Sequence, residues 1–114
     1  MVITSVDIAK ASDILKLLGD KTRLSMVKTL DSEDVCVCEF VALYEMSQPA
    51  VSQHLRKLKD FGLVNEKKRG QWKIFSLNKE SEYYPFVQSL LAHLPSQEDR
   101  LAELAQKGLR ISCE

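Results

Sequence analysis

The chain has 114 residues, 45% of them hydrophobic, which is enough for one domain with a modest core. Its 16 basic and 16 acidic residues cancel, which argues against a protein that coats nucleic acid through bulk positive charge. No stretch approaches the roughly 18 to 20 uninterrupted apolar residues of a membrane span, and the charged N-terminal segment does not resemble a signal peptide. We therefore expect a cytoplasmic protein with no membrane partner.

The first 45 residues predict three helices. Apolar residues recur at helical spacing over residues 4–18, and Gly19 ends this helix. Asp20 is a favourable N-cap for a second helix, and a third is expected between Cys36 and Glu45. In the second helix we expect a buried stripe formed by Leu24, Val27 and Leu30. The opposite, exposed face is expected to be basic, with Lys21, Arg23 and Lys28.

The fourth helix has the clearest predicted limits, from about Gln48 to Phe61. Ser47 is its N-cap, Pro49 lies in the first turn, where a missing N–H costs little, and Gly62 follows its end. Its core-facing positions are predicted at the spacing i, i+4 and i+7, at Val51, Leu55 and Leu58.

A β-hairpin and two further helices are predicted beyond the fourth helix. Two β-like runs, residues 63–68 and 72–77, are separated by Arg69-Gly70-Gln71, a gap of turn length that contains the needed glycine. An apolar stripe over residues 86–94 and a second segment over 97–107 then predict two helices. The predicted fold class is mainly α with a β-hairpin, one domain over residues 1–114.

Charge is distributed unevenly along this pattern. Residues 31–46 contain five acidic residues and no lysine or arginine, whereas residues 48–73 contain seven basic residues against two acidic ones. Helix, tight turn, helix and basic hairpin form the layout of a winged helix-turn-helix, in which the second helix enters the major groove and the hairpin lies along the backbone. We therefore expect residues 47–73 to bind double-stranded operator DNA.

The residue types within 47–73 fit separate roles on DNA. Short and amide side chains near the start of the fourth helix suit base edges, whereas Arg56 and Lys57 suit phosphates or a guanine. His54 lies next to two core positions, so it either contacts DNA or packs beneath the helix. The predicted DNA-binding set is Ser47, Gln48, Ser52, Gln53, His54, Arg56, Lys57, Lys67, Lys68, Arg69 and Gln71.

Three sequence runs resemble the arsenic-repressor (ArsR/SmtB) family of bacterial metal-sensing repressors: LGDKTRLSMVKTL, SQPAVSQHLRKLKDFGLV and KKRGQWKIFSL. The resemblance spans Ile14 to Leu77, most of the chain. It implies an α-rich homodimer, held together by its first and last helices. It also implies a repressor of an efflux or detoxification operon that leaves DNA when an inducer binds.

Cys36-Val37-Cys38 resembles the thiol motif that arsenite-, cadmium- and lead-sensing members of this family carry at the start of the third helix. Thiolates select soft ions, so the expected inducer is arsenite or antimonite. The alternatives are lead, which also suits a two- or three-thiol site, and cadmium or zinc if further ligands join. Relatives can place a third cysteine where this chain has Val41. Cys113 either supplies the third metal-binding thiol or is a tail cysteine without a role.

The spacing of Cys36 and Cys38 predicts a mechanism. On a regular helix, residues two apart project about 200° from each other, so both sulfurs cannot reach one ion. Inducer binding therefore has to unwind the first turn of the third helix. That unwinding is expected to shift residues 47–59 relative to the partner subunit.

Other functions have less support in the sequence. The second metal site known in the family is missing, because His93 is the only imidazole in residues 79–94. The usual catalytic constellations are absent and no organic cofactor is predicted. A thiol oxidoreductase would be expected to carry a βαβ pattern, which this chain lacks. The remaining alternatives are a repressor whose thiols sense oxidation or reactive sulfur and a winged-helix module that binds protein.

Overall fold

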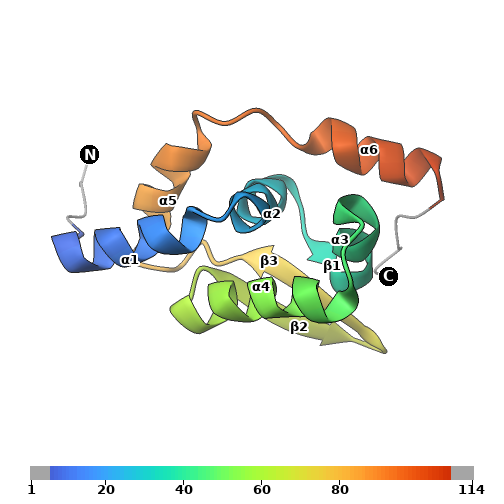
Figure 1. Cartoon of the computed structure of the whole chain (residues 1–114), viewed down its shortest axis with the longest axis horizontal. Coiled ribbons are helices and arrows are strands. Elements are labelled where there is room, and N and C mark those ends of the chain that lie inside the picture. The colour runs from blue at the N-terminus through green and yellow to red at the C-terminus, as the bar shows by residue number, and fades with distance from the viewer. Residues whose placement is uncertain (1–5, 109–114) are drawn as a thin grey trace.

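The computed structural model describes residues 6–108 and contains six helices and three strands in that range. The elements follow the order α1 (Ile8–Leu18), α2 (Lys21–Ser32), β1 (Val35–Cys36), α3 (Val37–Tyr44), α4 (Gln48–Phe61), β2 (Val64–Arg69), β3 (Trp72–Leu77), α5 (Tyr84–Leu91) and α6 (Glu98–Gln106). Figure 1 shows α4 beside the β2–β3 hairpin on one side of the molecule and α6 on the other. The predicted class, mainly α with a hairpin wing, is confirmed.

The first helix begins later than its apolar pattern predicted. Residues 6 and 7 precede the helix, because the Asp7 carboxylate accepts a hydrogen bond from the Lys10 amide at 2.9 Å and so caps α1. Ile14 and Leu18 are buried, whereas Ile8 and Leu15 are 88% and 52% exposed. One apolar face of α1 is therefore open in the single chain.

The second helix begins at the predicted cap, where the Asp20 carboxylate accepts from the Arg23 amide at 3.0 Å. The prediction that its basic face is exposed is partly wrong, because only Lys21 of the three predicted residues is exposed. Lys28 is half-buried and its ammonium donates to the Leu91 carbonyl at 3.0 Å, which ties α2 to the end of α5. Arg23 is also half-buried.

The three strands form one antiparallel sheet in the order β1-β3-β2. The predicted hairpin is confirmed, with Gly70 in its turn at φ 62°. The sequence did not predict β1, in which Val35 pairs with Phe75 and Cys36 with Ile74. This short pairing fixes the backbone of Cys36 in an extended conformation just before α3.

The two C-terminal helices were predicted at nearly the right places. Val87 and Leu91 of α5 and Leu101 and Leu104 of α6 are buried against the rest of the chain. The sixth helix packs on α3, where the Arg100 guanidinium lies 5.2 Å from the centre of the Tyr44 ring. Within residues 6–108, none of the helices combines the length and apolar character that crossing a membrane requires.

Candidate DNA-binding surface and thiol site

The fourth helix presents its polar residues to solvent because its apolar residues are fixed in the core. Val51, Leu55 and Leu58 are fully buried, as their spacing predicted. The Ser47 hydroxyl accepts from the Ala50 amide at 3.3 Å and caps the helix, and Gly62 ends it at φ 90°. Ser52 is half-buried, and four residues of the predicted DNA-binding set are exposed along α4: Gln48, Gln53, Arg56 and Lys57.

His54 makes a contact within the protein. One Arg23 guanidinium nitrogen lies 3.1 Å from His54 Nδ1, and the Arg23 Nε–H donates to the Leu17 carbonyl at 2.7 Å. Since guanidinium only donates, Nδ1 acts as the acceptor in this bond. Arg23 therefore joins the end of α1 to α4, a role that the sequence pattern assigned to no residue.

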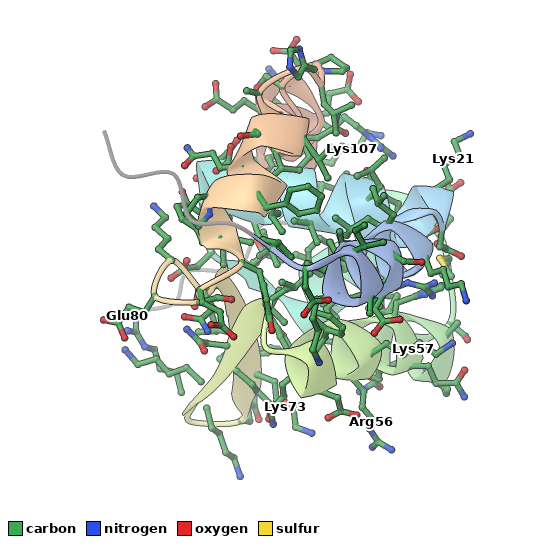
Figure 2. All side chains as sticks on the ribbon, turned by 90° about the vertical axis from the view of Figure 1, so that its left-hand side faces the viewer. Lys21, Arg56, Lys57, Lys73, Glu80 and Lys107 are labelled. Carbon is green, nitrogen blue, oxygen red and sulfur yellow. The ribbon has the colours of Figure 1, made fainter. Side chains whose placement is uncertain are left out.

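The wing carries its basic residues at the free end of the hairpin. Lys67, Lys68, Arg69 and Gln71 are all exposed, and Lys68 pairs in register with Lys73 on β3. Like charges directly opposite on two strands repel, so an anion between them would relieve the repulsion. In Figure 2, Arg56, Lys57 and Lys73 lie toward the side formed by α4 and the hairpin, whereas Lys107 lies near the opposite end of the view.

One basic residue of this region has a partner of its own. The Lys59 ammonium lies 3.5 Å from Glu66 Oε1, an ion pair between α4 and β2. Both side chains are partly exposed, so the pair contributes little to stability. It does reduce the positive charge that Lys59 offers to an external anion.

The two thiols face each other without any unwinding of α3. Cys36 belongs to β1 and is the N-cap of α3 at φ −82° and ψ 151°, while Cys38 is the second helical residue. Their sulfurs lie 3.1 Å apart in a thiol–thiol hydrogen bond, and neither forms a disulfide. The prediction that a shared ion requires an unwound helix is wrong, because it assumed that both residues belong to the helix.

Bond geometry shows how near this pair is to a bound arrangement. Two metal–sulfur bonds of about 2.3 Å, meeting at a right angle or a tetrahedral angle, separate their sulfurs by roughly 3.3–3.8 Å. The observed 3.1 Å is shorter by only a few tenths of an ångström. The Cys36 amide donates to Glu39 Oε1 at 2.8 Å, and Glu39 is fully buried, so this turn is fixed from beneath.

Burial raises the pKa of Cys38 to about 12, and its hydrogen bond to Cys36 adds to the shift. Cys38 is therefore a neutral thiol at physiological pH, and a ligand that binds its sulfur has to displace the proton.

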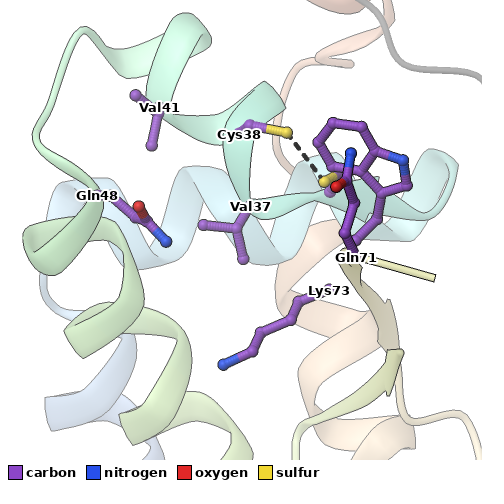
Figure 3. A pocket seen from close by; sticks show the side chains of 8 residues that line it. Val37, Cys38, Val41, Gln48, Gln71 and Lys73 are labelled. Carbon is purple, nitrogen blue, oxygen red and sulfur yellow. Dashed lines mark hydrogen bonds between the residues drawn. The ribbon is translucent and has the colours of Figure 1, made fainter. Parts of the chain in front are cut away.

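The thiols line a pocket of about 320 Å³ between α3, the start of α4 and the wing. Val37, Val41 and Trp72 give it a mainly apolar lining. In Figure 3, Val37 and Val41 lie between Cys38 and Gln48, and the Lys73 side chain points away from the sulfurs. The remaining lining residues come from the predicted DNA-binding set or lie beside it: Gln48, Gln71 and Lys73.

The other predicted metal ligands are not gathered at this pocket. Among residues 6–108, no three His, Cys, Asp or Glu side chains come close enough together to hold a metal ion. His93 is exposed just beyond the end of α5, far in sequence from the thiols. Cys113 lies outside the described residues, so its part in the site stays a prediction.

This helix-turn-helix, with its basic wing and the α4 surface beside it, defines a DNA-binding transcriptional regulator. Comparison with known proteins gives the particular family: the model described as "Bacterial regulatory protein, arsR family" matches residues 20–66. The chain belongs to this family, and the resemblance stated from its sequence runs is confirmed.

Individual relatives agree in fold and sequence. The chain is 37% identical over 68 residues to the arsenic resistance transcriptional regulator ArsR1 of Pseudomonas putida, covering 59% of this chain and 53% of that protein. It is 39% identical over 67 residues to the HTH-type transcriptional regulator MJ1325 of Methanocaldococcus jannaschii, covering 58% and 75%. Reduced HlyU from Vibrio cholerae superposes with a TM-score of 0.64 at 34% identity, covering 72% and 85%. The chain spans about half the length of the Pseudomonas relative.

Proposed function

We propose that this chain represses an arsenic resistance operon and leaves its operator when arsenite or antimonite binds Cys36 and Cys38. One observation carries the proposal: two thiols in contact at 3.1 Å line a pocket that also contains Gln48 and Lys73. Gln48 opens the helix proposed to enter the major groove, and Lys73 belongs to the wing. A ligand bound at the sulfurs thus occupies space that the two DNA-binding elements share.

The switch follows from this shared space. Ligand binding requires the sulfurs to separate by a few tenths of an ångström, and it fills the space between α3 and the wing. Because Cys36 also belongs to the sheet through its pairing with Ile74, a shift at its sulfur acts on β3 directly. The start of α4 and the wing then change their relative position, which lowers the affinity for DNA.

A homodimer completes the proposed repressor. Ile8 and Leu15 lie seven residues apart on one face of α1 and are 88% and 52% exposed, an apolar surface that a second copy would cover. Leu101 and Leu104 of α6 are buried within the chain itself. We therefore assign part of the dimer contact to the first helix, and the contribution expected from the last helix stays a prediction.

Binding of arsenite should be visible both at the thiols and on DNA. Under a non-thiol reductant, arsenite titrated into the protein should produce a sulfur-to-arsenic ultraviolet band, and it should release a tightly binding duplex selected from random sequences. Cys36→Ser and Cys38→Ser should each abolish the band and the release while retaining DNA binding.

Two outcomes would overturn the assignment. Release of DNA by arsenite in both variants would separate the inducer from these thiols. Release by peroxide with a mass loss of two hydrogens, and none by arsenite, would identify a redox-sensing repressor instead.

A further inference from the structure

Within the part of the chain that the structure describes, the thiol pocket offers two sulfurs. Cys36 and Cys38 are the cysteines of residues 6–108, and no third protein ligand of the usual kinds joins them there. Trivalent arsenic forms three bonds, so an arsenic bound to both sulfurs keeps one substituent of its own. The surroundings of that substituent determine which arsenic compounds fit.

Those surroundings are mainly apolar. Val41 follows Cys38 by three residues on α3, which puts the two on neighbouring positions of the helix surface, and it lines the pocket together with Val37 and Trp72. Figure 3 shows Val37 and Val41 beside Cys38. The polar lining residues Gln48, Gln71 and Lys73 are exposed. The pocket has a volume of about 320 Å³, which leaves space for a substituent in addition to the arsenic atom.

This lining discriminates between two kinds of third substituent. A hydroxyl that remains on arsenic loses water when it is placed against valine and tryptophan side chains, whereas a methyl or aryl group gains by leaving water. We infer that the pocket beside Cys36 and Cys38 binds trivalent arsenicals that carry one organic group more tightly than it binds arsenous acid, an inference that rests on the proposed function.

The reaction is a ligand exchange without a change of oxidation state. A monosubstituted arsonous acid, R–As(OH)₂, forms two arsenic–sulfur bonds with Cys36 and Cys38 and loses two arsenic–oxygen bonds. Each departing hydroxyl takes the proton of one thiol and leaves as water. The arsenic–carbon bond remains intact, and R occupies the space between Val41 and Trp72.

The test compares three probes on the full-length protein under a non-thiol reductant: methylarsonous acid, phenylarsonous acid and arsenous acid. Trp72 is the only tryptophan of the chain, so its fluorescence reports on the pocket without a label. Both substituted probes should bind with 1:1 stoichiometry and at least about tenfold more tightly than arsenous acid. The phenyl compound should change the Trp72 emission most.

Val41 provides a matched pair of variants. Val41→Cys adds a third thiol and should raise the affinity for arsenous acid at least about tenfold, which removes the preference. In Val41→Ser the new side chain is similar in size to cysteine but has no thiol, so arsenous acid should remain the weakest ligand. Cys113→Ser should leave the affinities for both substituted probes unchanged.

The outcomes separate this inference from the proposed function. If arsenous acid binds as tightly as the substituted compounds, the inference fails while the proposed function stands, and weakening by Cys113→Ser would identify the third thiol. If Cys36→Ser changes the binding of none of the three probes, the proposed function fails as well.

Discussion

The salt dependence of DNA binding can distinguish the basic residues that face DNA from those that pair within the protein. Lys68 is exposed on the wing and lies opposite Lys73, whereas Lys59 lies 3.5 Å from Glu66. Replacing each lysine by alanine removes the same charge from two positions on one side of the molecule. Only the change at Lys68 is expected to remove a phosphate contact.

The magnitude follows from counterion release. Each neutralised phosphate contributes about 0.9 to the slope of log K against log salt, and a dimer loses two contacts per substitution, so the slope should fall by about 1.8. When salt is raised from about 50 to about 200 mM, the DNA affinity of the wild type should therefore fall by a factor about ten times larger than that of Lys68→Ala. Lys59→Ala should change the slope by much less than one contact per subunit.

Fluorescence anisotropy with a random-sequence duplex at four or more salt concentrations measures these slopes, and thermal unfolding verifies that both variants are folded. A slope change near 0.9 for Lys68→Ala would indicate one subunit on DNA instead of two. An unchanged slope for Lys68→Ala together with a large change for Lys59→Ala would refute this assignment of the DNA-binding surface.

Three further predictions concern the scaffold. Gly62→Ala should destabilise the protein by about 1–2 kcal/mol in urea unfolding, because φ is 90° there and a Cβ would meet nothing within 4 Å, so conformational strain alone acts. Asp20→Ala should cost about 1 kcal/mol at pH 7 by removing the cap of α2. The hydrogen bond from the Arg23 amide lowers the pKa of Asp20 in the folded protein. The stability that this cap contributes is therefore fully present above the unfolded pKa of about 3.9, and it is lost as pH falls through the lower folded pKa. In Asp20→Asn the contribution of the cap should not depend on pH. Leu15→Asp should shift the protein toward monomer in sedimentation equilibrium, and an unchanged mass would exclude this face of α1 as the dimer contact.

The elements with strong local signals were predictable from the sequence. Ser47, Pro49 and Gly62 mark the ends of α4, and Gly70 marks the turn of the wing, because each supplies a conformation or hydrogen bond that the backbone needs at that position. Once the core positions of α4 are assigned, this layout predicts that the basic residues within 48–73 belong to the DNA-binding surface. Fold class and the predicted DNA-binding surface therefore depend on short-range patterns.

The geometry of the thiol site depends on a long-range pairing. A strand of two residues has no periodicity, and β1 exists because Val35 and Cys36 pair with Phe75 and Ile74, nearly 40 residues later in the chain. That pairing places Cys36 outside α3 and brings its sulfur to the Cys38 sulfur. The same limit applies to Arg23, whose burial requires a helix 31 residues away.

Reciprocal coupling between the thiols and DNA is the central claim, and one pair of titrations tests it. The affinity for the arsenical should be measured on the free protein and on the protein saturated with the selected duplex. Linkage requires that DNA lowers the affinity for the arsenical by the same factor by which the arsenical lowers the affinity for DNA. That factor is expected to be about 5–150. Equal affinities in the two titrations would show that the pocket and the DNA-binding surface are independent, which contradicts the account.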